Sequence, residues 1–99
     1  MELEQIRIFC AVAGCRSFSR AAQELYVSHS TTCRAVAALE AELGVRLLAR
    51  SRRAVALTPA GELLLREGRA LLCQADMLSA RLRAMGETLP EGEIKPGKE

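Results

Sequence analysis

Apolar residues recur every three or four positions through the first 43 residues, which is the spacing of amphipathic helices. The first run predicts a helix over about residues 3–13, and Gly14 is its stop signal. The apolar stripe of this helix consists of Leu3, Ile6, Phe9, Cys10 and Ala13. A second, shorter helix extends to about Leu25, and either Ser17 or Ser19 serves as its N-cap.

A third helical run follows a tight connection at Tyr26 and Val27 and starts from Ser28, a favourable N-cap residue. Gly44 ends this run, so the pattern predicts a helix over residues 28–43. One narrow arc of the helix carries Thr32, Val36, Leu39 and Leu43. The opposite face carries Ser30, Arg34, Ala37, Ala38 and Ala41. The apolar arc is therefore expected to face the core.

Residues 45–57 change from a helical to an extended pattern. The apolar positions of the two short extended runs are Val45, Leu47 and Leu48, then Val55 and Leu57. A basic tip of sequence Arg50-Ser51-Arg52-Arg53 lies between them. The pattern predicts a small two-stranded hairpin, although its alanines are poor strand formers.

Thr58 followed by Pro59 is a strong helix start, and no further proline occurs before Pro90. A helix over residues 59–85 is predicted, roughly 40 Å long at about 1.5 Å per residue. Its seam has the a/d spacing of a coiled coil and consists of Leu64, Leu71, Leu78 and Met85, with Gly68, Ala75 and Leu82 offset by four. Because the domain is too small to cover the whole seam, part of the seam is expected to pack on a second copy. The small Gly68 and Ala75 would let the two helices approach closely.

These patterns divide the chain into residues 1–58, the long helix 59–85 and a segment 86–99. The last segment has no periodic stripe and is rich in glycine, proline and charge, which predicts a flexible tail. The fold class is therefore mostly α, with three helices and a small hairpin followed by one long helix.

Charge is unevenly distributed, although the net charge of the 99 residues is only +2. Residues 1–58 carry a net charge of +3, and arginine outnumbers lysine twelve to two. Arginine pairs well with phosphates and base edges because its planar guanidinium makes two hydrogen bonds at once. On charge alone, however, ordinary surface solvation explains the pattern better than a nucleic-acid partner does.

Several classes of function have no support in the sequence. The four cysteines have no C-x-x-C spacing and His29 is the only histidine, so neither a metal site nor a disulfide framework is expected. No pairing of a nucleophile with a base and no Gly-rich phosphate loop is present, so we expect neither an enzyme nor a cofactor. No signal peptide and no apolar run of about 20 residues occurs, which predicts a cytoplasmic protein with reduced thiols.

The segment from the second helix through the start of the long helix resembles the N-terminal domain of LysR-type transcriptional regulators. The family pattern has S-F-[ST]-x-A-A-x-x-L, then V-S-Q, L-E-x-x-L-G-V-x-L-F-x-R and L-T-x-A-G. The matching residues are Ser17, Phe18, Ser19, Ala21, Ala22, Leu25, Val27, Ser28, Leu39, Glu40, Leu43, Gly44, Val45, Leu47, Arg50, Leu57, Thr58, Ala60 and Gly61. The resemblance covers about residues 1–85, and so many matches in one register make it specific.

The resemblance implies a winged helix-turn-helix. The helix over residues 28–43 would enter the major groove of double-stranded DNA, and the wing at residues 50–53 would touch the backbone or the minor groove. The long helix 59–85 would pair antiparallel with that of a second copy, so a homodimer on a near-palindromic operator is expected. Full-length members of the family continue into an effector-binding domain. A small-molecule effector would act through that domain, which this chain lacks.

The residues expected to contact DNA are Ser17, Ser19, Ser28, His29, Ser30, Thr31, Arg34, Arg50, Arg52 and Arg53. His29 replaces a common glutamine of the family, and its single donor and single acceptor lie on different sides of the ring, so base preference is expected to differ. Cys33 replaces a common serine, which leaves open a redox-sensitive thiol or simply a small neutral side chain.

The alanines on the outer face of the third helix leave it barer than in many family members. This departure indicates fewer direct base contacts and leaves a second class of function open. The chain would then be an interaction module that pairs with full-length regulators through the long helix.

Overall fold

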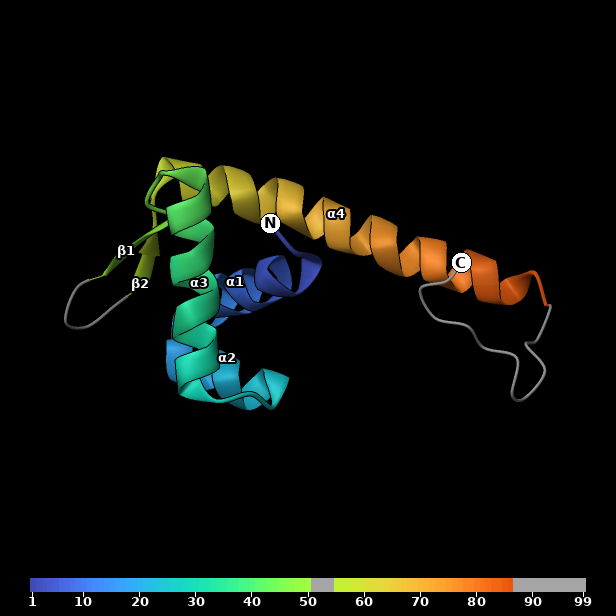
Figure 1. The fold of residues 1–99 in the computed structure, drawn as a ribbon, viewed down its shortest axis with the longest axis horizontal. Helices are drawn as coiled ribbons and strands as arrows, with labels where there is room; N and C mark the ends of the chain where they lie inside the picture. Colours follow the sequence, from blue (N-terminus) through green and yellow to red (C-terminus); the bar gives the residue numbers. More distant parts are fainter. Residues whose placement is uncertain (51–54, 87–99) are drawn as a thin grey trace.

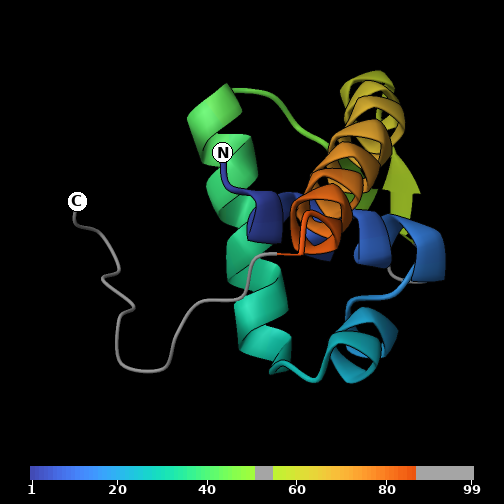
Figure 2. The same ribbon diagram turned by 90° about the vertical axis from the view of Figure 1, so that its right-hand side faces the viewer.

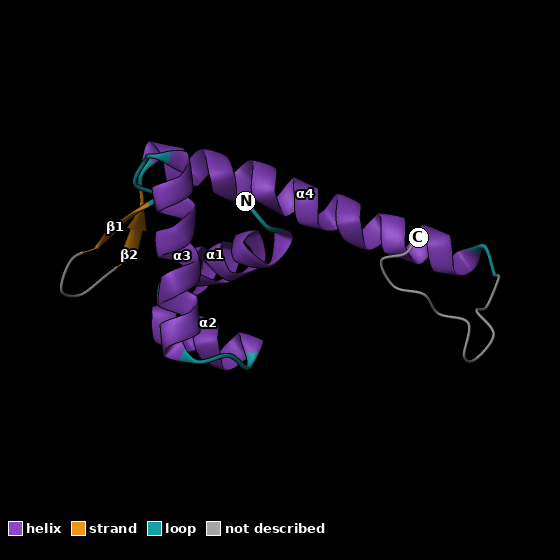
Figure 3. Ribbon diagram, viewed as in Figure 1, coloured by secondary structure: helices purple, strands orange, loops and turns teal. Residues whose placement is uncertain are grey.

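The computed structural model describes residues 1–50 and 55–86, with Arg50 described for its backbone only (Figure 1). The elements in chain order are α1 (Leu3–Cys15), α2 (Phe18–Leu25), α3 (His29–Leu43), β1 (Leu48–Arg50), β2 (Val55–Leu57) and α4 (Pro59–Ala84). Figure 3 shows that helix dominates this part of the chain, with one small antiparallel sheet between α3 and α4 in chain order. The predicted fold class, mostly α with a two-stranded hairpin and a long final helix, is confirmed.

The helix starts follow from local side-chain chemistry. Ser17 caps α2 by accepting a hydrogen bond from the Arg20 amide at 3.1 Å, which selects Ser17 over Ser19 as the N-cap. Ser28 caps α3 as predicted, and Thr58 caps α4 by accepting from the Gly61 amide at 3.0 Å. Each cap satisfies an amide that has no partner within its own helix.

The predicted end of the first helix is wrong. Gly14 lies inside α1, which continues to Cys15, and the left-handed cap residue is Arg16 with φ 55°. The Arg16 amide donates to the Val12 carbonyl at 2.8 Å. Cys15 packs against the core, so burial keeps the last residues of the helix ordered where a local signal favoured a stop.

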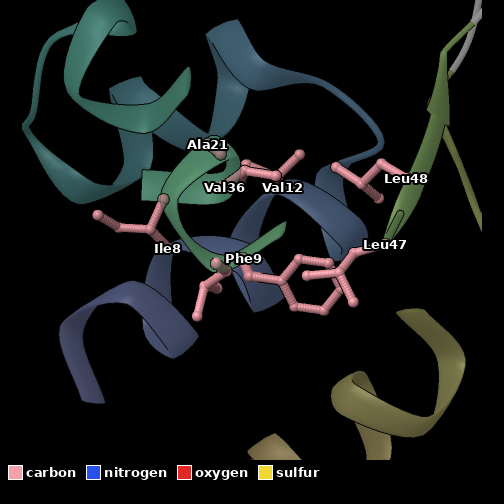
Figure 4. Close-up of a cluster of buried hydrophobic side chains, with 8 residues drawn as sticks. Ile8, Phe9, Val12, Ala21, Val36, Leu47 and Leu48 are labelled. Carbon is pink, nitrogen blue, oxygen red and sulfur yellow. The ribbon is translucent and has the colours of Figure 1, made fainter. Parts of the chain in front are cut away.

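The core forms around α1, which contacts α2, α3 and α4 (Figure 2). Phe9 is completely buried, and Figure 4 shows it with Val12 of the same helix, Val36 of α3 and Leu47. Full burial of such side chains contributes about 1.5–3 kcal/mol each. One phenyl ring surrounded by aliphatic side chains therefore holds the three-helix unit together.

The predicted inner arc of α3 is buried except at its end. Thr32, Val36 and Leu39 are buried, whereas Leu43 is 40% exposed. The expectation that Leu43 faces the core is therefore wrong. Leu43 instead borders a surface groove together with Val45 and Leu63, because the last turn of α3 extends beyond the packed core.

The hairpin pairs Leu48 with Leu57 and Arg50 with Val55 in antiparallel register. Val45 was expected in the first extended run, but β1 begins only at Leu48. The basic side chains of the predicted tip, including Arg52 and Arg53, lie outside the described residues.

Helix α4 has two distinct parts. Its first part packs on α1, and its second part projects beyond the three-helix unit (Figures 1 and 2). Gly68 is buried in the first part, and a Cβ built there would lie 2.8 Å from Cγ2 of Ile6. The expectation that Gly68 admits a second copy is therefore wrong, because this glycine admits α1 of the same chain. The predicted tail from residue 87 onward lies outside the described residues.

The first prediction concerns Gly61, where α4 crosses the segment before β1. A Cβ at this position would lie 2.0 Å from the Leu47 carbonyl oxygen, which is backbone and cannot rotate away. Gly61→Ala is therefore expected to lower the free energy of unfolding by about 3 kcal/mol or more, measured by urea denaturation.

Gly14→Ala is the matched control for this substitution. Its Cβ would meet nothing closer than Arg69 at 3.8 Å, and the position is helical. The control should raise the free energy of unfolding by about 0.5–1 kcal/mol. Equal effects of the two substitutions would contradict the close packing at Gly61.

Candidate nucleic-acid interface

The start of α3 presents a row of polar side chains at the end of the domain farthest from α4 (Figure 1). The Ser28 hydroxyl accepts from the Thr31 amide at 3.0 Å and donates to the Thr31 hydroxyl oxygen at 2.9 Å. The Ser28 hydroxyl therefore uses its proton and one lone pair within the cap. The Thr31 hydroxyl only accepts in this pair, so its own proton is available to donate outward.

His29 and Ser30 are exposed in the first turn of α3. The His29 ring lies 6.3 Å from the Phe18 ring of α2, with the ring planes tilted by 58°. Its Nδ1 atom is 3.7 Å from the Cys33 sulfur. These contacts occupy one side of the ring, which leaves Nε2 as the nitrogen able to meet an external group.

The contact between Phe18 and His29 also brings the first turns of α2 and α3 near each other. Neither of these turns contains an acidic residue, whereas α1 and α4 carry Glu4 and Glu62 in their first turns. The amides at a helix start form its positive end. Two such ends without a neutralising carboxylate make this surface suitable for an anion such as phosphate.

Arg34 is exposed one turn further along α3 and forms no ion pair within the described part of the chain. Ala37, Ala38 and Ala41 follow on the same outer face and are all exposed. The outer face of α3 therefore carries hydrogen-bonding groups at its start and only methyl groups further along. Ser17 is the half-buried cap of α2, and Ser19 is exposed in its first turn.

Glu40 connects α3 to the hairpin, a role that the sequence did not indicate. One carboxylate oxygen of Glu40 accepts from the amides of Leu47 at 2.8 Å and Leu48 at 3.2 Å. The Thr58 hydroxyl donates to the Arg46 carbonyl at 2.6 Å, and the Thr58 amide donates to the Leu47 carbonyl at 3.1 Å. The hairpin is thereby held to α3 on one side and to the start of α4 on the other.

A signal for Glu40 exists in retrospect. A carboxylate in the last turn of a helix is repelled by the negative end of the helix dipole, so its burial there requires hydrogen-bond donors as partners. The amides just before a short strand supply that partner.

The thiols and the described residues as a whole offer little else for chemistry. Burial raises the pKa of the Cys10 thiol, against the lowering effect of Arg69 and Arg7. Burial and the nearby Glu24 also raise the pKa of Cys15. Within residues 1–50 and 55–86, no group of three or more potential metal ligands occurs. No helix in that part of the chain is long and apolar enough to span a membrane.

Three helices, then a two-stranded hairpin and then a long helix define a winged helix-turn-helix domain. The sequence model described as "Bacterial regulatory helix-turn-helix protein, lysR family" matches residues 3–62. The chain belongs to this family, as the sequence resemblance predicted.

Individual relatives agree with the family assignment. The chain is 45% identical over 84 residues to the Hca operon transcriptional activator HcaR of Escherichia coli K12, covering 85% of this chain and 28% of HcaR. Its fold matches the crystal structure of the CbnR DBD–DNA complex with a TM-score of 0.82 and 41% identity, covering 88% of this chain and all of that one.

The fold also matches full-length OxyR from Pseudomonas aeruginosa, with a TM-score of 0.84, 36% identity and coverage of 88% of this chain and 30% of that one. The chain thus spans less than a third of HcaR and of OxyR.

The second prediction concerns Glu40. Glu40→Ala leaves the Leu47 and Leu48 amides without their acceptor, so it is expected to lower the free energy of unfolding by about 2–3 kcal/mol in urea denaturation.

Glu42→Ala is the matched control, because Glu42 is an exposed acid of the same helix and its only ion pair among the described residues is with the N-terminal ammonium group. Its loss should cost less than about 1 kcal/mol. A loss no larger for Glu40→Ala than for Glu42→Ala would show that the carboxylate does not anchor the hairpin.

Proposed function

We propose that this chain binds double-stranded DNA as a homodimer and regulates transcription, with α3 in the major groove. The observation that carries the proposal is the surface formed by the first turns of α2 and α3, two helix starts without an acidic residue beside exposed hydrogen-bonding side chains. The likeness to the CbnR DBD–DNA complex supports it. DNA as the target also implies a cytoplasmic location.

The side chains at the start of α3 are proposed to read base edges. His29, Ser30, Thr31 and Arg34 are the groups that reach outward, and Arg34 has the fork that pairs with guanine in the major groove. Ser28 supports the reading surface by fixing Thr31. Since the alanines beyond Arg34 offer only methyl groups, specificity is concentrated in a single turn and a half of α3.

Backbone contacts are assigned to the flanking groups. Ser17 and Ser19 lie at the start of α2, where hydroxyls and amides favour phosphate. Arg50, Arg52 and Arg53 of the wing are proposed to contact the backbone or the minor groove. Three arginines within four residues repel one another unless an anion lies nearby.

The homodimer is proposed to form through α4, where the described side chains leave an apolar stripe uncovered. The stripe consists of Leu71, Leu78, Leu82 and Met85, and the last three lie on the part of α4 that projects beyond the three-helix unit. Leu64 and Ala75, which the sequence also placed on the seam, are half-buried by the same chain. A continuous exposed apolar stripe of this kind is unfavourable in water unless another surface covers it.

An apolar groove of about 440 Å³ extends the stripe toward the end of α3. The residues that line it include Met1, Leu43, Val45, Leu63, Leu71 and Glu67. If two α4 helices pair antiparallel about Gln74, the C-terminal end of one reaches this groove on the other. The same pairing brings Glu67 opposite Arg81 of the partner subunit, so shape and charge both favour a second copy as the occupant.

The third prediction tests DNA binding. Selection from random duplexes at a stated salt concentration is expected to enrich a near-palindrome that this chain binds. On that duplex, Arg34→Ala should weaken binding about tenfold, measured by fluorescence anisotropy. If Arg34 pairs with a phosphate, the slope of log affinity against log salt also falls by about 0.9.

Arg83→Ala removes the same charge from an exposed position on α4, away from the apolar stripe, and serves as the control. It should change affinity less than about twofold. If the selection enriches no palindrome, the proposal that the chain binds a specific DNA sequence is wrong. A chain that dimerises but does not bind duplex at low salt would instead be an interaction module for longer regulators.

The fourth prediction tests the dimer. Leu78 is 53% exposed and lies beyond the three-helix unit, so Leu78→Asp should leave the fold intact. A carboxylate buried between two apolar helices is strongly unfavourable, so the dimer dissociation constant should rise about 100-fold or more in sedimentation equilibrium.

Ala80→Asp places the same charge on the opposite face of the same turn of α4, and it should leave dimerisation unchanged. Glu67→Arg should weaken the dimer, and adding Arg81→Glu should restore it. Equal dissociation constants for Leu78→Asp and Ala80→Asp would rule out the apolar stripe as the interface.

A further inference from the structure

Tyr26, the C-cap residue of α2, combines an unusual backbone conformation with a solvent-exposed side chain. Its backbone is left-handed, with φ 58° and ψ 42°. The Tyr26 amide donates to the Gln23 carbonyl at 3.3 Å, and the Val27 amide donates to the Ala22 carbonyl at 3.0 Å. These bonds end α2 and turn the chain toward α3.

The turn itself gives no reason for a tyrosine. Left-handed backbone disfavours side chains with a Cβ, and glycine or asparagine is the usual residue at this position after a helix. Gly44 serves the same role after α3 in this chain, with φ 72°. Arg16 and Tyr26 are the two non-glycine residues with positive φ in the described part of the chain. A bulky side chain on such backbone is uncommon and motivates a search for a functional role.

The core does not use the ring either. Tyr26 is 95% exposed, more than any other large hydrophobic side chain in the described part of the chain. Over the same residues, its side chain takes part in no hydrogen bond, ion pair or ring contact. The phenol group is therefore fully available to an external partner.

Tyr26 lies close to the surface proposed to bind DNA. It comes two residues before Ser28, in the connection that leads directly into the exposed first turn of α3 (Figure 1). A helix that enters the major groove with its first turn brings the preceding connection to the edge of the groove, where the phosphates lie. A phenol hydroxyl is a suitable donor to a phosphate oxygen.

We propose that Tyr26 contacts the sugar–phosphate backbone of duplex DNA at the edge of the groove that α3 enters. The hydroxyl donates to a phosphate oxygen and the ring lies against the neighbouring deoxyribose. This inference rests on the proposed DNA-binding function and adds a residue that the family pattern did not supply.

The test uses Tyr26→Phe and Tyr26→Asn in the full chain, on the duplex enriched by selection. Tyr26→Phe loses the hydroxyl and should bind about fivefold more weakly. Tyr26→Asn loses hydroxyl and ring and should bind at least about tenfold more weakly. Because asparagine tolerates left-handed backbone, Tyr26→Asn should also have a higher melting temperature than the unsubstituted chain. Weaker binding together with higher stability cannot come from misfolding.

Two further readouts separate this contact from a charge effect. Tyrosine is uncharged, so both variants should keep the salt slope of the unsubstituted chain, whereas loss of an arginine–phosphate pair lowers it. Ethylation of one phosphate per half-site should weaken binding by the unsubstituted chain and have no effect on binding by Tyr26→Phe. Gln23→Ala, an exposed change one turn earlier on α2, is the control and should bind normally.

The outcomes are distinguishable. Unchanged affinity in both variants, with Arg34→Ala still impaired, overturns the inference, leaves the proposed function standing and points to a protein partner for the ring. Absence of duplex binding by the unsubstituted chain overturns the proposed function and the inference with it.

Discussion

The burial of Phe9 determines the geometry of the whole domain. Its ring is enclosed at the point where α1 meets α3 and the segment before β1. No other aromatic side chain is fully buried, so the aliphatic residues around Phe9 have one large group to pack against. Every helix is then positioned relative to α1, including α4, which reaches it through the bare backbone of Gly68. The angle between α3 and α4 thus depends on this single packed centre.

Features that depend on neighbouring residues along the chain could be predicted from the sequence. Ser28 and Thr58 cap their helices with their own side chains, so their roles do not depend on the rest of the fold. Features that depend on which surfaces meet could not be predicted. Gly14 has the local chemistry of a helix stop, but packing of Cys15 carries α1 onward. A seven-residue repeat also does not reveal which of its apolar positions pack on the same chain and which remain free for a partner. Gly68, one of these positions, faces α1 of the same chain.

The candidate site shows the same division. The exposed residues at the start of α3 were predictable because cap, period and family register agree there. The contribution of Glu40 was not, since its partners are amides seven and eight residues away in a segment of different structure. The engagement of Ser28 with Thr31 was also hidden, because the sequence alone does not say how a hydroxyl divides its bonds. Hydrogen-bond geometry therefore changes the roles of the predicted DNA-contacting residues: Ser28 acts as a cap, and Thr31 is free to donate outward.

The unbroken course of α4 has a consequence for the DNA that the proposed dimer would bind. The part that projects beyond the three-helix unit contains neither glycine nor proline, so it behaves as a stiff rod at about 1.5 Å per residue. In the proposed dimer, two such rods set the distance between the two reading heads. Rotation or bending at the far ends would change the spacing between half-sites while leaving each head intact. An attached domain could in this way alter which DNA geometry is accepted without touching a single base-reading residue.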